Sequence, residues 1–247
     1  MEMFGRTESQ LSRIVTHMLN DLYDKFHHLL EFDERRLTAP MLEELAQTVA
    51  ARGAPLDRCF GFIDGTLRGV CRPSFGQRQL FSGHKRTHGL KFQSVVTPDG
   101  IIIHMSGPWA GRHHDAHMLR ESGLAALLER HCSDDGGPYL IYGDPAYPVQ
   151  AHIRSPHRDT QLTAEQVSFN ASMSSVRQCV EWCFGDIIRN FAFLDFKKNL
   201  KVMLQPVGKL YIVGAFLTNV RTCMHGNLTA SYFMVDPPAL SEYLHLE

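Results

Sequence analysis

The sequence is poor in the features that mark secreted, membrane-spanning and disordered proteins. Its six cysteines among 247 residues lack the dense, regular spacing of a disulfide scaffold, so reduced thiols are expected. The longest apolar run, 210–220, is shorter than the about 20 residues that a helix needs to cross a bilayer. Residues 1–10 contain no hydrophobic stretch of the signal-peptide kind. Together with 44% hydrophobic residues, these absences predict a soluble intracellular protein with one sizeable domain.

The chain also lacks a net charge that would draw it towards nucleic acid, because its formal charge is −1. The charges are unevenly distributed, however. Residues 68–91 contain no Asp or Glu, but they contain Arg68, Arg72, Arg78, His84, Lys85, Arg86, His88 and Lys91. Such a block predicts a local positive surface that can meet phosphates. An ordinary solvated loop explains it equally well.

Residues up to about Ala51 have the pattern of helices. Apolar residues recur every three or four positions, as on one buried helix face, at Leu11, Ile14, Val15, Met18, Leu19 and Leu22. A second helix, 40–53, begins at a Pro and ends at a Gly. We therefore predict an N-terminal helical segment over residues 1–58 and a second domain over residues 59–247.

From Cys59 onwards, aromatic and β-branched residues dominate. The segments CFGFIDGTLRGVC and HGLKFQSVVTPDGIIIHMSG, the second with a PDG turn, predict three consecutive antiparallel strands. The pattern then predicts a helix over 115–131 with Asp115 as its N-cap, a fourth strand over 139–144, a long helical stretch over 162–191 with a candidate break near Asn170, and a final helix over 210–220. This order is that of an α/β, RNase H-like domain, a mixed sheet flanked by helices.

Two carboxylates are expected to meet in such a sheet, because its first strand is central and its fourth strand pairs beside it. Asp64 lies on the first strand and Asp144 ends the fourth. Each Asp alone also suits a turn or a cap. Glu181, on the following helix beside apolar positions, offers a third carboxylate. Arg177, one turn earlier, would satisfy Glu181 as a simple ion pair, and the competing partner is a metal ion.

Three carboxylates at one site are suitable ligands for Mg²⁺ or Mn²⁺. Two such ions about 4 Å apart activate a water on one side of a phosphodiester and stabilise the leaving oxygen on the other. We predict that Asp64, Asp144 and Glu181 are catalytic and bind two ions. Asp64 would bridge the ions, and Asp144 and Glu181 would each complete one side.

Several blocks in the same order resemble the DDE transposases of the PIF/Harbinger type and the nucleases derived from them. They are FIDGT at Asp64, SGHKRTHGLKFQ from Ser82, TPDGIIIHMSGPWAGRHHDAHMLRES from Thr97, GDPAYP at Asp144 and FNASMSSVRQCVEWCFGDIIRNF from Phe169. The resemblance covers about residues 60–193. It implies an RNase H-like fold, a metal-dependent cut at DNA ends and transfer of the freed 3′ hydroxyl into target DNA. The acids that it carries over are Asp64, Asp144 and Glu181.

The segment GRHHDAHM allows more than one interpretation. His113, His114, Asp115 and His117 have the chemistry of a transition-metal site, and a His-rich metal hydrolase is one hypothesis. In the family that the chain resembles, a His-Asp pair recurs after the third strand. His114 and Asp115, together with Arg177, are therefore candidates for supporting roles around the acids. A direct role for His114 or Asp115 in the active site stays open.

The resemblance also gives the basic block a meaning, because the block falls between the first two strands of a nuclease domain. Lys85, Arg86 and Lys91 are candidate DNA contacts that would position phosphates without reading sequence. The segment DFKKNLK (195–201) is a second candidate.

The N-terminus departs from the family pattern, in which a helix-turn-helix precedes the catalytic domain. Here FGR (4–6) leads into a segment that resembles only the last helix of that motif. This departure implies a separate Myb-like DNA-binding partner, and analogy implies a homodimer in the nucleus, with the cytoplasm also open. Two functions follow: an active metal-dependent endonuclease or transposase, favoured because all three acids are present, and a catalytically silent adaptor that binds DNA or protein.

Overall fold

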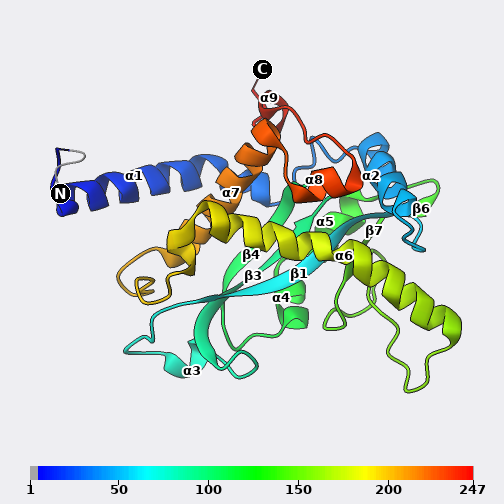
Figure 1. The fold of residues 1–247 in the computed structure, drawn as a ribbon, viewed down its shortest axis with the longest axis horizontal. Helices are drawn as coiled ribbons and strands as arrows, with labels where there is room; N and C mark the ends of the chain where they lie inside the picture. Colours follow the sequence, from blue (N-terminus) through cyan, green and yellow to red (C-terminus); the bar gives the residue numbers. More distant parts are fainter. Residues whose placement is uncertain (1–4, 247) are drawn as a thin grey trace.

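The computed structural model describes residues 5–246 and has a mixed sheet with helices on both of its faces (Figure 1), which confirms the predicted fold class. The six-stranded sheet has the order β2-β3-β1-β7-β8, with β4 also paired to β3. Its strands are β1 (Cys59–Gly69), β2 (Phe81–Ser82), β3 (Thr87–Val96), β4 (Ile102–Ala110), β7 (Leu140–Gly143) and β8 (Ile153–Arg154), and β5 (Ser133–Asp134) and β6 (Gly137–Pro138) form a separate small hairpin.

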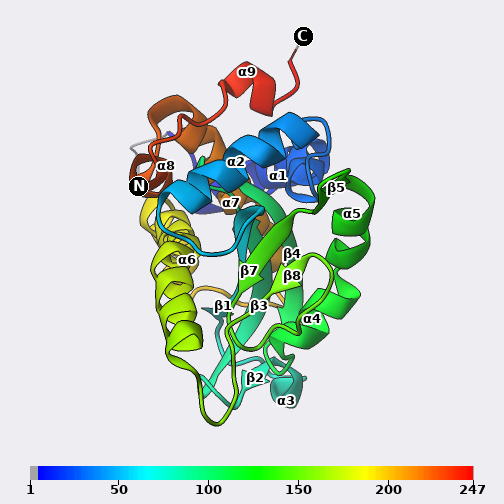
Figure 2. The ribbon, with the colours of Figure 1, turned by 90° about the vertical axis from the view of Figure 1, so that its right-hand side faces the viewer.

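The helices form two layers around this sheet. They are α1 (Glu8–Phe26), η1 (His27–Leu30), α2 (Ala39–Ala51), α3 (Gln77–Leu80), α4 (Asp115–Glu121), α5 (Leu124–His131), α6 (Ala164–Asn190), η2 (Ala192–Asp195), α7 (Val207–His225), α8 (Leu228–Phe233) and α9 (Leu240–Tyr243). Figure 2 shows α6 on one face of the sheet and α4 and α5 on the other. The cleft described below therefore receives side chains from both layers.

The three predicted antiparallel strands are β1, β3 and β4. In the predicted PDG turn, Gly100 has a positive φ of 80°, which favours glycine. The turn also contains a feature that the pattern did not indicate: Asp99 is buried and accepts a hydrogen bond from Arg36 Nη1 at 2.6 Å. This buried ion pair ties the N-terminal segment to the sheet.

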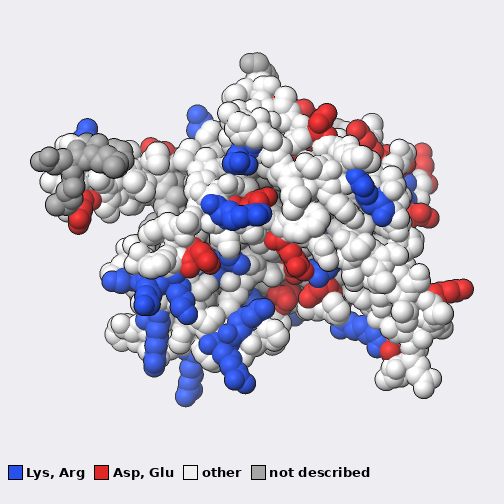
Figure 3. Space-filling view, viewed as in Figure 1, with Lys and Arg blue, Asp and Glu red and all other residues white. Residues whose placement is uncertain are grey.

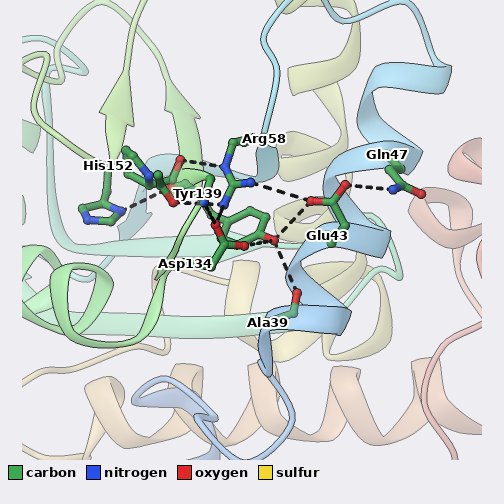
Figure 4. A network of polar contacts seen from close by, with 10 residues as sticks. Ala39, Glu43, Gln47, Arg58, Asp134, Tyr139 and His152 are labelled. Atoms are coloured by element: carbon green, nitrogen blue, oxygen red, sulfur yellow. Dashed lines mark hydrogen bonds and ion pairs between the residues drawn. The ribbon is translucent and has the colours of Figure 1, made fainter.

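The fourth strand, β7, runs parallel to β1 and pairs directly beside it, as predicted. The register places Ile63 opposite Gly143, so the next residues of the two strands, Asp64 and Asp144, emerge at the same end. The other end of the pair is held by the network in Figure 4. There Arg58 Nη2 contacts Asp134 Oδ1 at 2.6 Å, and the Tyr139 hydroxyl lies 2.8 Å from Asp134 Oδ2 and 3.1 Å from Glu43 Oε2 of α2.

Two helices differ from the prediction. The long helix α6 continues through Asn170, whose side chain bonds to the backbone of His157 instead of breaking the helix. The helix predicted over 115–131 is divided into α4 and α5, because Gly123 takes a positive φ of 73° between them.

The predicted buried face of the first helix is wrong for three residues. Ile14, Val15 and Met18 are 45%, 50% and 53% exposed. The first part of α1 extends away from the body of the molecule (Figure 1), and its second part packs on α7, where Phe26 stacks on Phe216. Helical periodicity identified an apolar stripe correctly, but it contains no information on whether another element covers that stripe.

The hydrophobic core is continuous across residue 58. Leu30 and Leu42 of the N-terminal segment belong to the same buried cluster as Phe62 and Val96 of the sheet. The division of the chain into 1–58 and 59–247 stays a prediction. Within residues 5–246, no helix is long and apolar enough to cross a membrane.

The buried His104 of β4 generates a prediction about acid stability. Only 3% of it is exposed, and burial lowers its pKa to about 4, from about 6.5 in the unfolded chain. The unfolded state therefore binds a proton first as the pH falls, so stability is kept above pH 6.5 and lost between 6.5 and 4. We expect the free energy of unfolding of wild type to fall by about 3 kcal/mol more than that of His104→Gln between pH 7.5 and 4, measured by urea unfolding.

His17→Gln, at an exposed position, should behave like wild type. Equal losses in wild type and His104→Gln would contradict this.

Candidate active site

One open cavity of about 750 Å³ collects the three carboxylates that the sequence singled out. Asp64, Asp144 and Glu181 all line it, and so does Arg177. They come from β1, from the turn after β7 and from α6. The predicted convergence of these acids on one cleft is therefore present in the structure. Their catalytic and metal-binding roles stay predictions.

Asp64 is largely enclosed, with 16% of its side chain exposed. Its Oδ1 accepts a hydrogen bond from the backbone N–H of Gly65 at 2.8 Å, and its Oδ2 lies 3.2 Å from Arg177 Nη1. Burial raises the pKa of Asp64 to about 6, although Arg177 and the Gly65 N–H act in the opposite direction. Asp144 and Glu181 raise this pKa further by charge repulsion. Asp64 thus carries its charge at a cost that a cation would relieve.

Asp144 is held by the turn that ends β7. Its Oδ1 accepts a hydrogen bond from the backbone N–H of Ala146 at 2.9 Å. The residue before it must be small, because a Cβ on Gly143 would lie 2.6 Å from the ring of Tyr147. Tyr147 is fully buried, and its packing against Gly143 fixes the path of the chain at Asp144. The motif GDPAYP therefore needs its Gly and its Tyr as well as its Asp.

Glu181 reaches the cleft from α6 and is the most exposed of the three, with 57% of its side chain exposed. Its Oε1 lies 3.2 Å from Arg177 Nη2. Arg177 consequently contacts Asp64 with one terminal nitrogen and Glu181 with the other. The sequence predicted the pair with Glu181, one turn away, but not the contact with Asp64.

The donor chemistry of this site fits a divalent metal ion. Three carboxylates from three elements supply the oxygen ligands that Mg²⁺ and Mn²⁺ prefer. Asp64, Asp144 and Glu181 are the residues that would hold such an ion. In the present arrangement of side chains, residues 5–246 contain no group of three His, Cys, Asp or Glu side chains that could hold a metal ion. Arg177 instead lies between two of the acids, Asp64 and Glu181.

Asp115 brings a fourth carboxylate to the cleft. It is the first residue of α4, not the predicted N-cap; His114 occupies that position without capping through its side chain. A Cβ added to Gly65 would lie 2.6 Å from Asp115 Oδ1, which places this carboxylate directly over the residue after Asp64. Lys91 pairs with it at 3.1 Å. Lys91, a candidate DNA contact, is therefore already engaged with Asp115 at the cavity wall, which His114 also lines.

The remaining histidines of GRHHDAHM pack against each other and not around a common point. The rings of His113 and His117 stack with centroids 4.3 Å apart, and His117 Nδ1 contacts Arg120 at 2.9 Å. In the part of the chain that the structure describes, no group of side chains suited to a metal gathers here. The hypothesis of a His-rich metal hydrolase therefore finds no support.

Two basic segments that are distant in sequence lie side by side next to the cleft. Cys71 donates a backbone hydrogen bond to Leu200, and the side chain of Lys197 lies against Gly69. Figure 3 shows Lys and Arg gathered over α3 and the loop before α7, beside acidic side chains at the centre of this face. We call this the basic surface; its exposed cations are Arg72, Arg78, Lys85, Arg86, Lys197, Lys198 and Lys201.

Comparison with known proteins agrees with this arrangement. The family model of the DDE superfamily endonucleases matches residues 63–219, which is more than half of the chain, so the chain belongs to this family. It is also similar to Protein ALP1-like from Arabidopsis thaliana, with 20% identity over 197 residues. The match covers 75% of this chain and 47% of that protein, so the chain spans about half the length of this relative. No solved structure matches.

The raised pKa of Asp64 generates a stability prediction. Because the folded state holds the proton up to about pH 6 and the unfolded state only to about 3.8, stability falls as the pH rises from 4 to 6 and stays lowered above. We expect Asp64→Asn to be more stable than wild type by about 1–3 kcal/mol at pH 7.5, and the difference to vanish near pH 4. Urea unfolding in chelator measures this.

The matched control is Asp186→Asn, which removes another carboxylate paired with an arginine, Arg189, from α6. This variant should show no such gain at pH 7.5. An Asp64→Asn protein that is less stable than wild type at both pH values would show that Arg177 outweighs the cost of burial.

Proposed function

We propose that the protein is a metal-dependent DNA endonuclease or transposase of the PIF/Harbinger type. It cuts phosphodiester bonds with two divalent ions, Mg²⁺ or Mn²⁺, held by Asp64, Asp144 and Glu181. The observation that carries the proposal is that parallel pairing of β1 with β7, with α6 alongside, brings these three acids into one open cavity. Membership of the DDE superfamily endonucleases supports the same reaction class.

The chain's own residues prepare the site for this chemistry. When bound, the ions supply a lowered water pKa and stabilise charge on the phosphodiester oxygens. The Gly65 and Ala146 N–H groups fix one oxygen each of Asp64 and Asp144, so these carboxylates are oriented before any ligand arrives. Glu181, exposed at the mouth of the cleft, completes the ligand set. Asp115 and Lys91 form a paired wall behind Gly65.

The substrate that we propose is DNA, which the basic surface would hold through its phosphates. Exposed Lys and Arg side chains there make a local positive field although the whole chain has a formal charge of −1. Lys85 lines the cavity itself, and Arg86 follows it in the turn before β3. Such contacts position DNA without reading bases. A Myb-like partner for sequence reading, a homodimer and a nuclear location remain parts of this proposal.

A second candidate function is a catalytically silent adaptor that keeps the fold and binds DNA or protein. One observation favours it: Arg177 already contacts both Asp64 and Glu181 within the protein, so the fold can hold these acids together without a metal ion. The same contacts are expected in a protein that no longer catalyses a reaction. They are also expected in an active nuclease before its metal ions bind.

Removal of one carboxylate tests the nuclease. We expect wild type to nick labelled duplex DNA only with Mg²⁺ or Mn²⁺, and Asp144→Asn to be at least 100-fold slower, because the variant loses a metal-binding charge with little change in shape. Asp186→Asn, which alters a carboxylate on α6 outside the cavity lining, should keep wild-type rates. Absence of nicking by wild type that still binds DNA would favour the adaptor.

The basic surface predicts how DNA binding responds to salt. We expect Lys85→Gln with Lys198→Gln to weaken binding equally for unrelated DNA sequences. The slope of log K against log salt should fall by about 2, since each phosphate contact contributes about 0.9. Fluorescence anisotropy over a salt series measures this. Arg130→Gln, an exposed cation on α5, is the control. An unchanged slope in the double variant would place DNA elsewhere.

A further inference from the structure

We propose that Arg177 is a positioning residue that holds the metal-binding carboxylates in the metal-free protein and gives up its place when a divalent ion binds. The inference rests on the proposed function, because it assigns metal binding to Asp64 and Glu181. It adds an internal cation to that site, with an effect on metal affinity that can be measured without DNA.

The geometry of Arg177 is that of a bridge. Its Nη1 lies 3.2 Å from Asp64 Oδ2, and its Nη2 lies 3.2 Å from Glu181 Oε1. The two acids come from different elements, β1 and α6, so one guanidinium joins the sheet to the helix across the cleft. Only 20% of the Arg177 side chain is exposed. An arginine can make such a two-pronged contact because its terminal nitrogens diverge in a fixed plane.

Arg177 is the one cation that the described residues place against these two acids. Within residues 5–246, Asp64 and Glu181 form ion pairs with Arg177 alone. Lys91, another cation that lines the cavity, is paired with Asp115. The charge on Asp64 is therefore balanced chiefly by one side chain, and any ion that binds Asp64 and Glu181 together must compete with that side chain.

The competition follows from charge and space. A divalent ion bound to Asp64 and Glu181 would need the two oxygens that Arg177 now contacts, and two cations at neighbouring positions repel each other. The side chain can leave because it is long and flexible and borders an open cavity of about 750 Å³. In the metal-free protein the same arginine prevents the carboxylates from repelling each other. Removal of its charge should therefore strengthen metal binding.

The test is the affinity for Mn²⁺ of the full chain at fixed pH without DNA, measured from the electron paramagnetic resonance signal of free Mn²⁺. We expect Arg177→Gln to bind Mn²⁺ about tenfold more tightly than wild type. Arg177→Lys, which keeps the charge but cannot bridge two carboxylates, should lie between them. Arg189→Gln is the matched control, since Arg189 pairs with Asp186 on the same helix at 2.6 Å and does not line the cavity. It should bind like wild type.

Two further measurements complete the test. Asp64→Asn added to Arg177→Gln should abolish the tight binding, which assigns the Mn²⁺ to this site. Mn²⁺ should also raise the melting temperature of Arg177→Gln more than that of wild type, because the metal replaces the missing cation. If Arg177→Gln fails to fold without metal, Arg177→Lys carries the comparison with wild type.

The proposal is overturned if Arg177→Gln or Arg177→Lys binds Mn²⁺ as wild type does or more weakly, because Arg177 would then orient the acids for the metal. It is also overturned if wild type and both variants bind no Mn²⁺. A failure of the proposed function gives a different result. The Arg177 variants would then bind Mn²⁺ more tightly than wild type, as expected, but wild type would not nick DNA. Nicking without the expected change in affinity would remove only the role of Arg177.

Discussion

The parallel pairing of β1 with β7 is the constraint on which the candidate site depends. Ile63 stands opposite Gly143, and this register sends Asp64 and Asp144 to the same end of the sheet. A shift of one residue would turn one of them to the opposite face. The Arg58 network anchors one end of the pair, and the packing of Tyr147 on Gly143 fixes the other. The fold thus determines the separation of the acids.

The cleft brings together charges of both signs. While no positively charged ligand is bound, this assembly lowers the stability of the protein. Two cations, Arg177 and Lys91, offset the carboxylates at its inner wall, and Asp64 nevertheless has a raised pKa because it is buried. Such an arrangement lowers stability in return for a site that attracts positive charge. It distinguishes this cleft from an ordinary surface ion-pair network, in which carboxylates remain well solvated and their pKa values stay close to normal.

The surroundings of the cleft fit the proposal of a nucleic-acid substrate. The carboxylates in the cleft would repel phosphates, so the phosphates of DNA need cations close beside them, such as Lys85 at the cavity wall. The basic surface lies on that side and is made of two segments that meet only in the folded chain, as the hydrogen bond from Cys71 to Leu200 shows. Local positive charge beside the cleft would therefore explain how a nearly neutral chain approaches DNA.

The sequence by itself determined the order of the main strands β1, β3, β4 and β7 and of the helices around them, the turn between β3 and β4, and the elements that carry Asp64, Asp144 and Glu181. These are local properties, since side-chain periodicity and turn residues act within a few positions. Only the tertiary structure decided the exposure of Ile14, Val15 and Met18, the position of Asp115 over Gly65 and the contact of Arg177 with Asp64. That last contact joins residues 113 positions apart. The physical reason is that packing between distant segments, and not local pattern, determines which faces are covered and which charges meet.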